Sequence, residues 1–183
     1  CANAMSPRRE GTSSLNGGPM RGSIKHGEGP LIGNAGEHYV LAELLKRGCV
    51  AGMTPRNAPA FDILGWKGSR QFRIRVKTKT DEINDWQFAA KKDGTIFLGL
   101  ASGADYTVLV NLADELRDME FFVLRTKLLD KWLQQDFQDW VTTPGPRKPQ
   151  RDPKNPKRHL SHKKFHGRLL RHKDRWSLIT GSR

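Results

Sequence analysis

Hydrophobic residues begin to recur at helical spacing near Asn34, after a stretch with no such pattern. The apolar positions of this first periodic segment are Val40, Leu41, Leu44 and Leu45. With Asn34 as the N-cap and Gly48 just past the end, the pattern predicts a helix over residues 35–47. Residues 5–30 are rich in Gly, Ser, Pro and Arg and predict a flexible leader, so structure is expected from about Leu31.

An alternating pattern follows and predicts a β-hairpin. Phe61 to Trp66 is the first strand, and Lys67-Gly68-Ser69 is the turn. In the second strand the apolar residues Phe72, Ile74 and Val76 alternate with Arg73, Arg75 and Lys77. Because successive side chains point to opposite faces of a strand, one face is apolar and the other is cationic.

Three further apolar runs, at 96–100, 106–112 and 119–124, are short and rich in β-branched or aromatic residues, so each predicts a strand. Thr126 is expected to cap a helix that runs to about Trp140. Together these elements predict an α/β (α+β) domain over residues 31–143. Residues 1–4 precede Met5, look like an expression remnant, and are left out of the domain.

The positive charge is concentrated at one end of the chain. Of the formal net charge of +13, residues 144–183 hold 13 Lys and Arg against two acidic residues, a net charge of +11. Five prolines follow Thr143 within a short distance, which predicts an extended basic arm. The apolar stretch from Trp176 to Ile179 is expected to dock back on the domain. A polycation of this kind favours nucleic acid as the partner.

The sequence argues against several other classes of protein. No run of about 18 apolar residues exists, and the N-terminus lacks the apolar stretch of a secretory signal, so the expectation is a cytoplasmic protein with no membrane partner. Two cysteines form neither a disulfide framework nor a Cys-x-x-Cys site. Whether two copies associate as a homodimer is left open.

The hairpin brings an acid and a base together. If the chain turns at about Gly68, Asp62 lies opposite Ile74 or Arg75. Lys77 projects to the same face as Arg75, so Asp62 and Lys77 are expected to share a site. Hydrolysis of a phosphodiester uses a hard cation held by oxygen ligands, and a carboxylate beside a lysine suits that chemistry.

The order and spacing of these motifs resemble the PD-(D/E)XK nuclease superfamily, which includes Holliday-junction resolvases and many restriction enzymes, and a bacterial branch of it in particular. The residues that carry the resemblance are Gly36-Glu37-His38-Tyr39-Val40, Ala42-Glu43-Leu44-Leu45-Lys46-Arg47-Gly48, Pro55-Arg56-Asn57-Ala58-Pro59, Phe61-Asp62-Ile63-Leu64 and Ile74-Arg75-Val76-Lys77-Thr78. They span about residues 33–125.

The resemblance implies a restriction-endonuclease-like core, in which an N-terminal helix precedes a central mixed β-sheet flanked by helices. It implies that Asp62, Glu37 and the Val76 carbonyl hold Mg²⁺ or Mn²⁺, and that Lys77 orients or polarises the attacking water. Arg75 departs from the pattern, because the family has Glu, Asp or Gln there and an arginine cannot bind metal.

Each site residue also has a structural interpretation. Glu37 stands three residues after Asn34, the spacing of an N-terminal capping box. Asp62 is expected to serve the site, with an ion pair to Arg75 as the alternative. For Lys79 a solvated position is preferred over a role at the site. The candidate contacts to nucleic acid are Arg73, Arg75, Lys79, Lys163, Lys164, Arg168, Arg171 and Lys173.

Three functions fit these observations. The first is a Mg²⁺- or Mn²⁺-dependent endonuclease acting on DNA, with Asp62, Lys77 and Glu37 as catalytic residues. The second is a nuclease fold that binds nucleic acid without cleaving it, with Arg75 in place of a metal ligand. The third is an RNA- or ribosome-associated protein that works through its basic arm. DNA is favoured over RNA.

Overall fold

The computed structural model describes residues 29–55, 60–98, 100, 104–113, 115–145 and 150–181 of the chain. Its elements in chain order are α1 (Gly29–Lys46), β1 (Val50–Met53), β2 (Ile63–Lys67), β3 (Arg70–Thr80), β4 (Asp85–Ala89), β5 (Asp105–Leu112), η1 (Leu116–Asp118), β6 (Glu120–Arg125), α2 (Thr126–Thr142), β7 (Lys157–Ser161), α3 (His162–Leu169), η2 (Leu170–His172) and α4 (Ser177–Thr180).

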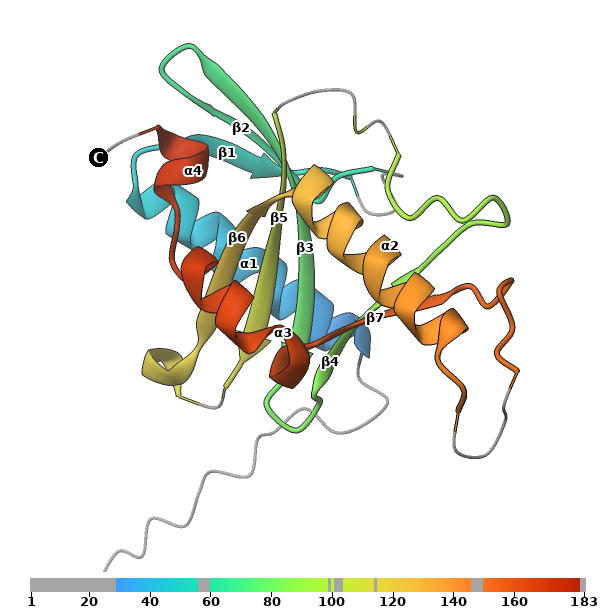
Figure 1. Ribbon diagram of the computed structural model, residues 1–183. Coiled ribbons are helices and arrows are strands. Elements are labelled where there is room, and N and C mark those ends of the chain that lie inside the picture. The colour runs from blue at the N-terminus through green and yellow to red at the C-terminus, as the bar shows by residue number, and fades with distance from the viewer. Residues whose placement is uncertain are drawn as a thin grey trace, which may run out of the picture.

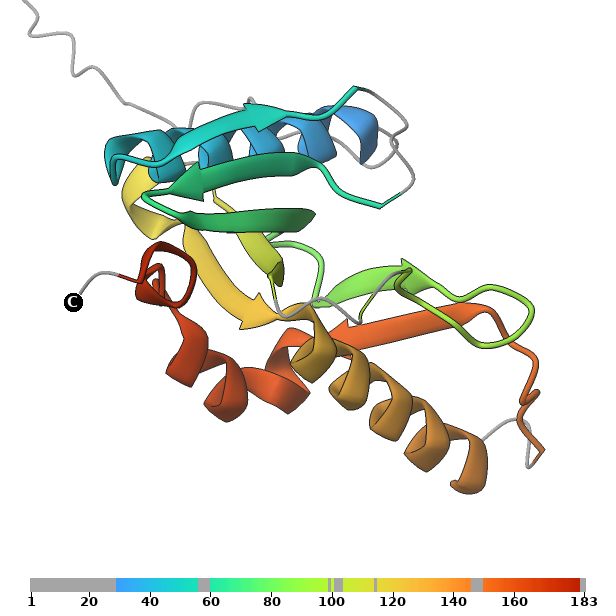
Figure 2. The same cartoon turned by 90° about the horizontal axis from the view of Figure 1, so that it is seen from above.

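A five-stranded mixed sheet in the order β1-β2-β3-β5-β6 forms the centre of the molecule. β3 and β5 pair in parallel, and the other neighbours pair antiparallel. Helix α1 covers one face of the sheet, while α2, α3 and a small β4–β7 sheet cover the other (Figures 1 and 2). The predicted α/β class, a mixed sheet flanked by helices, is confirmed.

Two hydrophobic clusters lie on the two sides of this sheet. The cluster under α1 includes Val40, Leu44, Ile63, Ile74, Val108 and Trp176. The cluster under α2 and α3 includes Trp86, Leu109, Phe122, Leu129, Leu160 and Phe165. Strand β5 contributes to both clusters and is buried along most of its length, as expected for a central strand in parallel pairing.

Helix α1 begins earlier than the sequence pattern predicts. It starts at Gly29, so the prediction of an N-cap at Asn34 is wrong and Glu37 lies well inside the helix, away from its first turn. Ile32 is buried, and this tertiary contact extends the helix beyond the periodic stretch. The C-terminal end is as predicted, since Gly48 follows the helix with a φ of 72° that favours glycine.

The predicted hairpin is confirmed by strands β2 and β3. Ile63 pairs with Ile74, and Gly68 turns the chain with a φ of 58°. Just ahead of β2, the Asp62 N–H donates to the Ile74 carbonyl at 2.9 Å and continues the ladder by one bond. This bond places Asp62 opposite Ile74, one of the two predicted partners.

The basic C-terminal segment is folded from Lys157 on, so the prediction of an extended arm is wrong for residues 157–181. Residues 150–156 contain no helix or strand, as the prolines predict. β7 pairs antiparallel with β4, and the buried side chains of Trp86 and Leu160 face each other in that pair. Neither strand was predicted, and the strand predicted at 96–100 is irregular where the structure describes it. The domain therefore continues past Thr143.

The end of the chain docks on the core as predicted. Trp176 and Ile179 are buried in the cluster under α1, and Phe122 forms a β-bridge with Lys173. At the start of α2, Thr126 is the first helical residue and does not act as the N-cap that the sequence predicts. Its buried hydroxyl instead lies 3.0 Å from the Thr107 hydroxyl.

No helix in the described part of the chain combines the length and the apolar character that crossing a bilayer demands. The predicted leader falls mostly on residues 1–28, which lie outside the described residues.

A substitution at Gly36 tests whether α1 must pack closely on β3. A Cβ atom at this position would lie 2.0 Å from Thr78 Oγ1 and 2.9 Å from Thr78 Cβ. We expect Gly36→Ala to lower the free energy of unfolding by about 1–3 kcal/mol, because the added methyl overpacks this contact. Urea unfolding measures the change.

Gly33 supplies the matched control, because it lies in the same helix and a Cβ there would meet nothing within 4 Å. Gly33→Ala should leave stability unchanged or raise it by about 0.5–1 kcal/mol. Adding Thr78→Ala to Gly36→Ala should restore part of the loss. Equal stability of Gly33→Ala and Gly36→Ala would show that the close contact is not a constraint.

Candidate functional site

The cationic face of β3 points into the protein toward aromatic side chains. Lys77 Nζ lies 5.6 Å from the Phe88 ring centroid, and Lys79 Nζ lies 4.9 Å from the Trp86 ring centroid. Both rings come from β4, which runs across this side of the sheet (Figure 2). The alternation of apolar and cationic residues in β3 is as predicted. The aromatic side chains that cover its cationic face belong to β4, a strand that the sequence pattern does not predict.

Asp62 and Lys77 line one pocket of about 290 Å³ at the edge of this cover. Its wall is formed by the hairpin, by β4 and by the segment after β4, and includes Phe61, Arg75, Val76, Phe88, Phe97 and Thr107. The predicted meeting of the acidic and the basic side chain is confirmed as geometry. Their catalytic roles stay predictions.

The Asp62 carboxylate is held in place by the backbone of β3. The Val76 N–H donates to Asp62 Oδ2 at 2.7 Å, across the open end of the hairpin. Burial raises the pKa of Asp62 above its ordinary value, while the Val76 N–H and the charges of Lys77 and Arg75 act in the opposite direction. The ionised carboxylate is thus partly desolvated, and a cation entering the pocket would stabilise it.

Lys77 has the complementary perturbation. Desolvation lowers the pKa of its ammonium group, and the charge of Asp62 opposes that effect. The residue as a whole is solvent-exposed, so solvent screens the shift and a ligand can still reach the side chain. An acid and a base whose pKa values both move toward neutrality within one pocket are typical of functional sites.

Arg75 also lines the pocket, but its guanidinium group is fixed by other contacts. It lies 4.4 Å from the Phe61 ring centroid and 5.5 Å from that of Phe97, and Nη2 donates to the Leu98 carbonyl at 2.7 Å. The carboxylate paired with it among the described residues is Asp105, at 3.9 Å. The alternative in which Asp62 forms the ion pair with Arg75 is therefore wrong.

Asp105 is a buried acid that the sequence analysis missed. It stands at the start of β5, directly beside Arg73 in the parallel register, and accepts a hydrogen bond from Arg73 Nε at 2.7 Å. One carboxylate thus serves two neighbouring arginines of β3. Only the parallel pairing of β3 with β5 brings these residues together, and no local pattern indicates it.

Glu37 is not among the residues that line the pocket. It belongs to α1, which packs on the other face of the sheet (Figure 2). The prediction that Glu37 lies in the first turn of a helix is wrong, and its predicted role as a metal ligand has no support from the pocket geometry.

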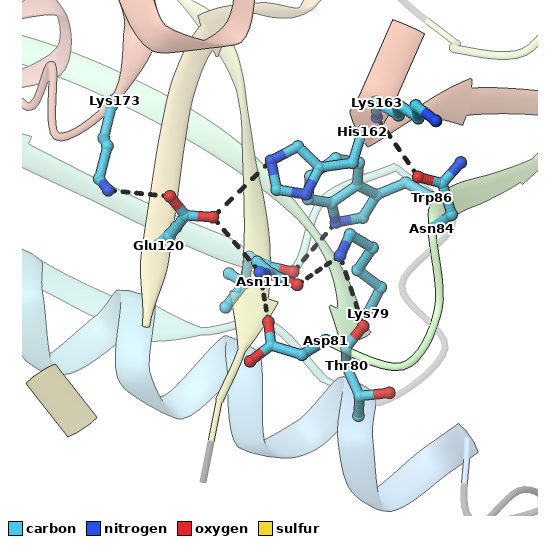
Figure 3. A network of polar contacts seen from close by, with 11 residues as sticks. Lys79, Thr80, Asp81, Asn84, Trp86, Asn111, Glu120, His162, Lys163 and Lys173 are labelled. Atoms are coloured by element: carbon cyan, nitrogen blue, oxygen red, sulfur yellow. Dashed lines mark hydrogen bonds and ion pairs between the residues drawn. The ribbon is translucent and has the colours of Figure 1, made fainter. Parts of the chain in front are cut away.

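Lys79 is buried, so the preference for a solvated side chain is wrong. Its ammonium group donates to Asn111 Oδ1 and to the Thr80 carbonyl, and burial lowers its pKa. The Asn111 amide in turn donates to Asp81 and Glu120. Figure 3 shows these groups converging at the C-terminal ends of β3 and β5. Lys79 is therefore not a surface contact for nucleic acid.

The same network anchors the C-terminal segment to the sheet. Lys173 Nζ donates to Glu120 Oε1 at 2.8 Å, and His162 Nε2 lies 3.7 Å from Glu120 Oε2 (Figure 3). Lys173 was predicted to contact nucleic acid, and here it forms an ion pair. Lys164 is likewise paired, with Asp136.

The remaining predicted contacts on the C-terminal segment are exposed. Lys163 and Arg168 lie on α3 and Arg171 lies on η2, and all three side chains face solvent. The neighbouring aromatic residues Phe165 and Trp176 are buried in the core and are not free to stack on bases. These aromatic residues therefore belong to the core.

The described residues contain no group of three or more His, Cys, Asp or Glu side chains placed to hold a metal ion. Asp62 is the one carboxylate among the residues that line the Asp62 pocket. Mg²⁺ is commonly bound by one or two carboxylates together with phosphate oxygens of the substrate. The pocket therefore fits a divalent cation only as a site completed by the substrate.

Comparison with solved structures gives distant likenesses. No family model and no curated protein matches the sequence. The solved structure of a bacterial homing endonuclease, I-Ssp6803I, is similar over 83% of this chain and 91% of that chain, with 12% sequence identity and a TM-score of 0.49. A likeness at this level establishes neither a shared family nor a shared reaction.

The raised pKa of Asp62 predicts a pH-dependent effect on stability. The folded-state pKa lies above the unfolded value of about 3.9, so stability falls as the pH rises through the interval between these two values. We expect Asp62→Asn to raise the free energy of unfolding at pH 7 by about 0.5–1 kcal/mol, because the amide carries no charge to desolvate. Urea unfolding at pH 7 and below about pH 4 tests this.

The gain should shrink at the lower pH, where the carboxyl group is protonated in both states. Asp118→Asn, which changes an exposed carboxylate on η1, controls for the general loss of one negative charge. A variant at Asp62 that is less stable than the wild type at pH 7 would contradict the assignment of desolvation as the dominant effect.

Proposed function

We propose that this chain is a nuclease that hydrolyses phosphodiester bonds in DNA at the Asp62 pocket, with the aid of one divalent cation. The observation that carries the proposal is the meeting of Asp62 and Lys77 in one pocket, with the Asp62 carboxylate positioned by the Val76 N–H. The resemblance of the hairpin motifs to the PD-(D/E)XK superfamily supports the same reading.

Each side chain of the pocket has a chemical task in this proposal. Lys77 is exposed and has a lowered pKa, so it can contact a phosphate oxygen or hold the attacking water. Arg75 adds a fixed positive charge that favours the approach of a phosphate. Because Phe61 and Phe97 flank its guanidinium group, Arg75 acts from the wall of the pocket and does not need to reorient.

The residues that would hold Mg²⁺ or Mn²⁺ are Asp62 and the Val76 carbonyl, with the phosphate of the substrate. When bound, such a cation lowers the pKa of water and neutralises charge that develops on the phosphoryl group. The Asp62 carboxylate, raised in pKa by burial, is the side chain in the pocket that gains most from a nearby positive charge.

A second candidate function is binding of nucleic acid without cleavage. Arg75 favours it, because an arginine replaces an acidic or amide side chain of the family pattern and the pocket holds a single carboxylate. The third function, an RNA- or ribosome-associated protein acting through a free arm, is not favoured, because residues 157–181 are folded onto the domain.

Plasmid nicking in Mn²⁺ tests the first function. We expect the wild-type chain to nick supercoiled DNA, and Asp62→Asn and Lys77→Met each to reduce the rate by about 10² or more, the usual effect of losing a catalytic acid or base. Lys67→Met, at the turn end of the same hairpin, is the matched control and should keep the wild-type rate.

Arg75→Gln separates the two candidate functions. If Arg75 excludes a cation, the variant gains Mn²⁺-dependent nicking while the wild type has none, and the binding function is the correct one. If the wild type already cleaves, the substitution should weaken DNA binding without abolishing the reaction. Cleavage that persists unchanged in Asp62→Asn would refute the assignment of the site.

A further inference from the structure

A second, larger groove of about 460 Å³ lies next to the Asp62 pocket. It is bounded by the segment after β4, by α2 and by the segment that leads into β7. Its most informative lining residues are Lys91, Lys92, Lys154, Arg158, Phe97 and Phe137. None of the functions considered above uses this groove.

Arg158 is an unusual residue in the wall of the groove. It is only 5% exposed, and its guanidinium group lies 3.3 Å from the centroid of the Phe137 ring. Nη1 donates to the carbonyls of Asn155 and Lys157, whereas Nε is buried with no hydrogen-bond partner among the described residues. No salt bridge joins Arg158 to a carboxylate in the described part of the chain, so an anion in the groove would stabilise its buried charge.

The charge of the groove favours the same kind of ligand. Four cationic residues line it, against the two acids Asp93 and Asp130. The hydrogen bond from the Thr95 N–H lowers the pKa of Asp93, whereas burial raises the pKa of Asp130. With both acids ionised, the four cations still leave the lining with a net charge of +2. Lys91, Lys92 and Lys154 are exposed at the rim, where they can follow a polyanion.

Phe97 connects the groove to the candidate active site, because it lines both. Its ring packs edge-on against Phe88 at 5.8 Å and contacts the guanidinium group of Arg75. A chain of phosphates that enters at Asp62 can therefore continue past Phe97 toward Arg158. Phe97 and Phe137 are buried in the wall, so the groove presents its cations to the phosphates of a strand rather than aromatic faces to its bases.

We propose that this groove binds a single-stranded segment of DNA that flanks the phosphate held at Asp62. The inference rests on the proposed nuclease function and specifies its substrate as DNA with unpaired nucleotides next to the scissile bond. Its volume of about 460 Å³ suits a short stretch of one strand, which is why an unpaired strand is the proposed occupant. Arg158 and the three rim lysines contact its phosphates.

Fluorescence anisotropy tests the proposal in EDTA, where no cleavage occurs. The probe is a labelled single-stranded DNA of about 12 nucleotides, titrated between about 50 and 200 mM salt. Combining Lys91→Gln, Lys92→Gln and Lys154→Gln should weaken binding about tenfold or more and lower the logarithmic salt slope by about 2, since each phosphate contact on a single strand contributes about 0.7.

A charge-matched variant on the opposite side of the molecule gives the control. Lys46→Gln, Arg70→Gln and Arg117→Gln together remove three exposed charges from α1, β3 and η1. This variant should bind the single strand nearly as tightly as the wild type. Arg158→Met, checked for folding by thermal unfolding, should weaken binding without removing a rim charge.

Several results would overturn the proposal. They are equal loss of affinity in both triple variants, no loss in the rim variant, or no binding of the single strand by the wild type. Failure of the nuclease function looks different, because the chain would then bind the strand through the groove and still not nick DNA in Mn²⁺. The binding measurement therefore judges the groove, and the nicking measurement judges the Asp62 pocket.

Discussion

The architecture depends on how strand β3 accommodates a row of cationic side chains inside the protein. Arg73 and Arg75 share the buried carboxylate of Asp105, Lys77 lies beside Asp62 and Phe88, and Lys79 donates to Asn111 under Trp86. Aromatic faces and buried polar groups thus replace the water that these charges would otherwise require. Asp62 and Lys77 stand where this cover ends, so the candidate site is the part of the cationic row that remains open to a ligand.

The strand β4, which supplies this cover, is held in place by the polycationic end of the chain. β7 pairs with β4, α3 packs beside α2, and Lys173 binds Glu120, which joins the C-terminal segment to the end of the central sheet. A segment whose charge alone indicates a free arm therefore completes the fold. Its exposed cations therefore stand on a folded surface, where their positions are set before any ligand arrives.

Local patterns predict the parts of this molecule that local interactions determine. The hairpin, its turn at Gly68 and the position of Asp62 opposite Ile74 follow from alternation and turn chemistry. The partner of Arg75 could not be found this way, because Asp105 reaches it only through parallel pairing of distant strands. Strand β7 could not be predicted, because prolines and charged residues surround it in the sequence. Its side chains are buried through the pairing with β4 and not because the segment is itself apolar. The start of α1 was missed because burial of Ile32 extends the helix beyond its periodic stretch.

The central claim is that the Asp62 pocket receives a phosphodiester together with a divalent cation. A crystal structure of the chain with Mn²⁺ and a phosphorothioate oligonucleotide tests it most directly, because Mn²⁺ scatters anomalously and the modified bond resists hydrolysis. The account predicts an anomalous peak between Asp62 and the Val76 carbonyl, with a phosphate oxygen within reach of Lys77. A phosphate bound by Arg75 with no metal beside Asp62 would contradict it.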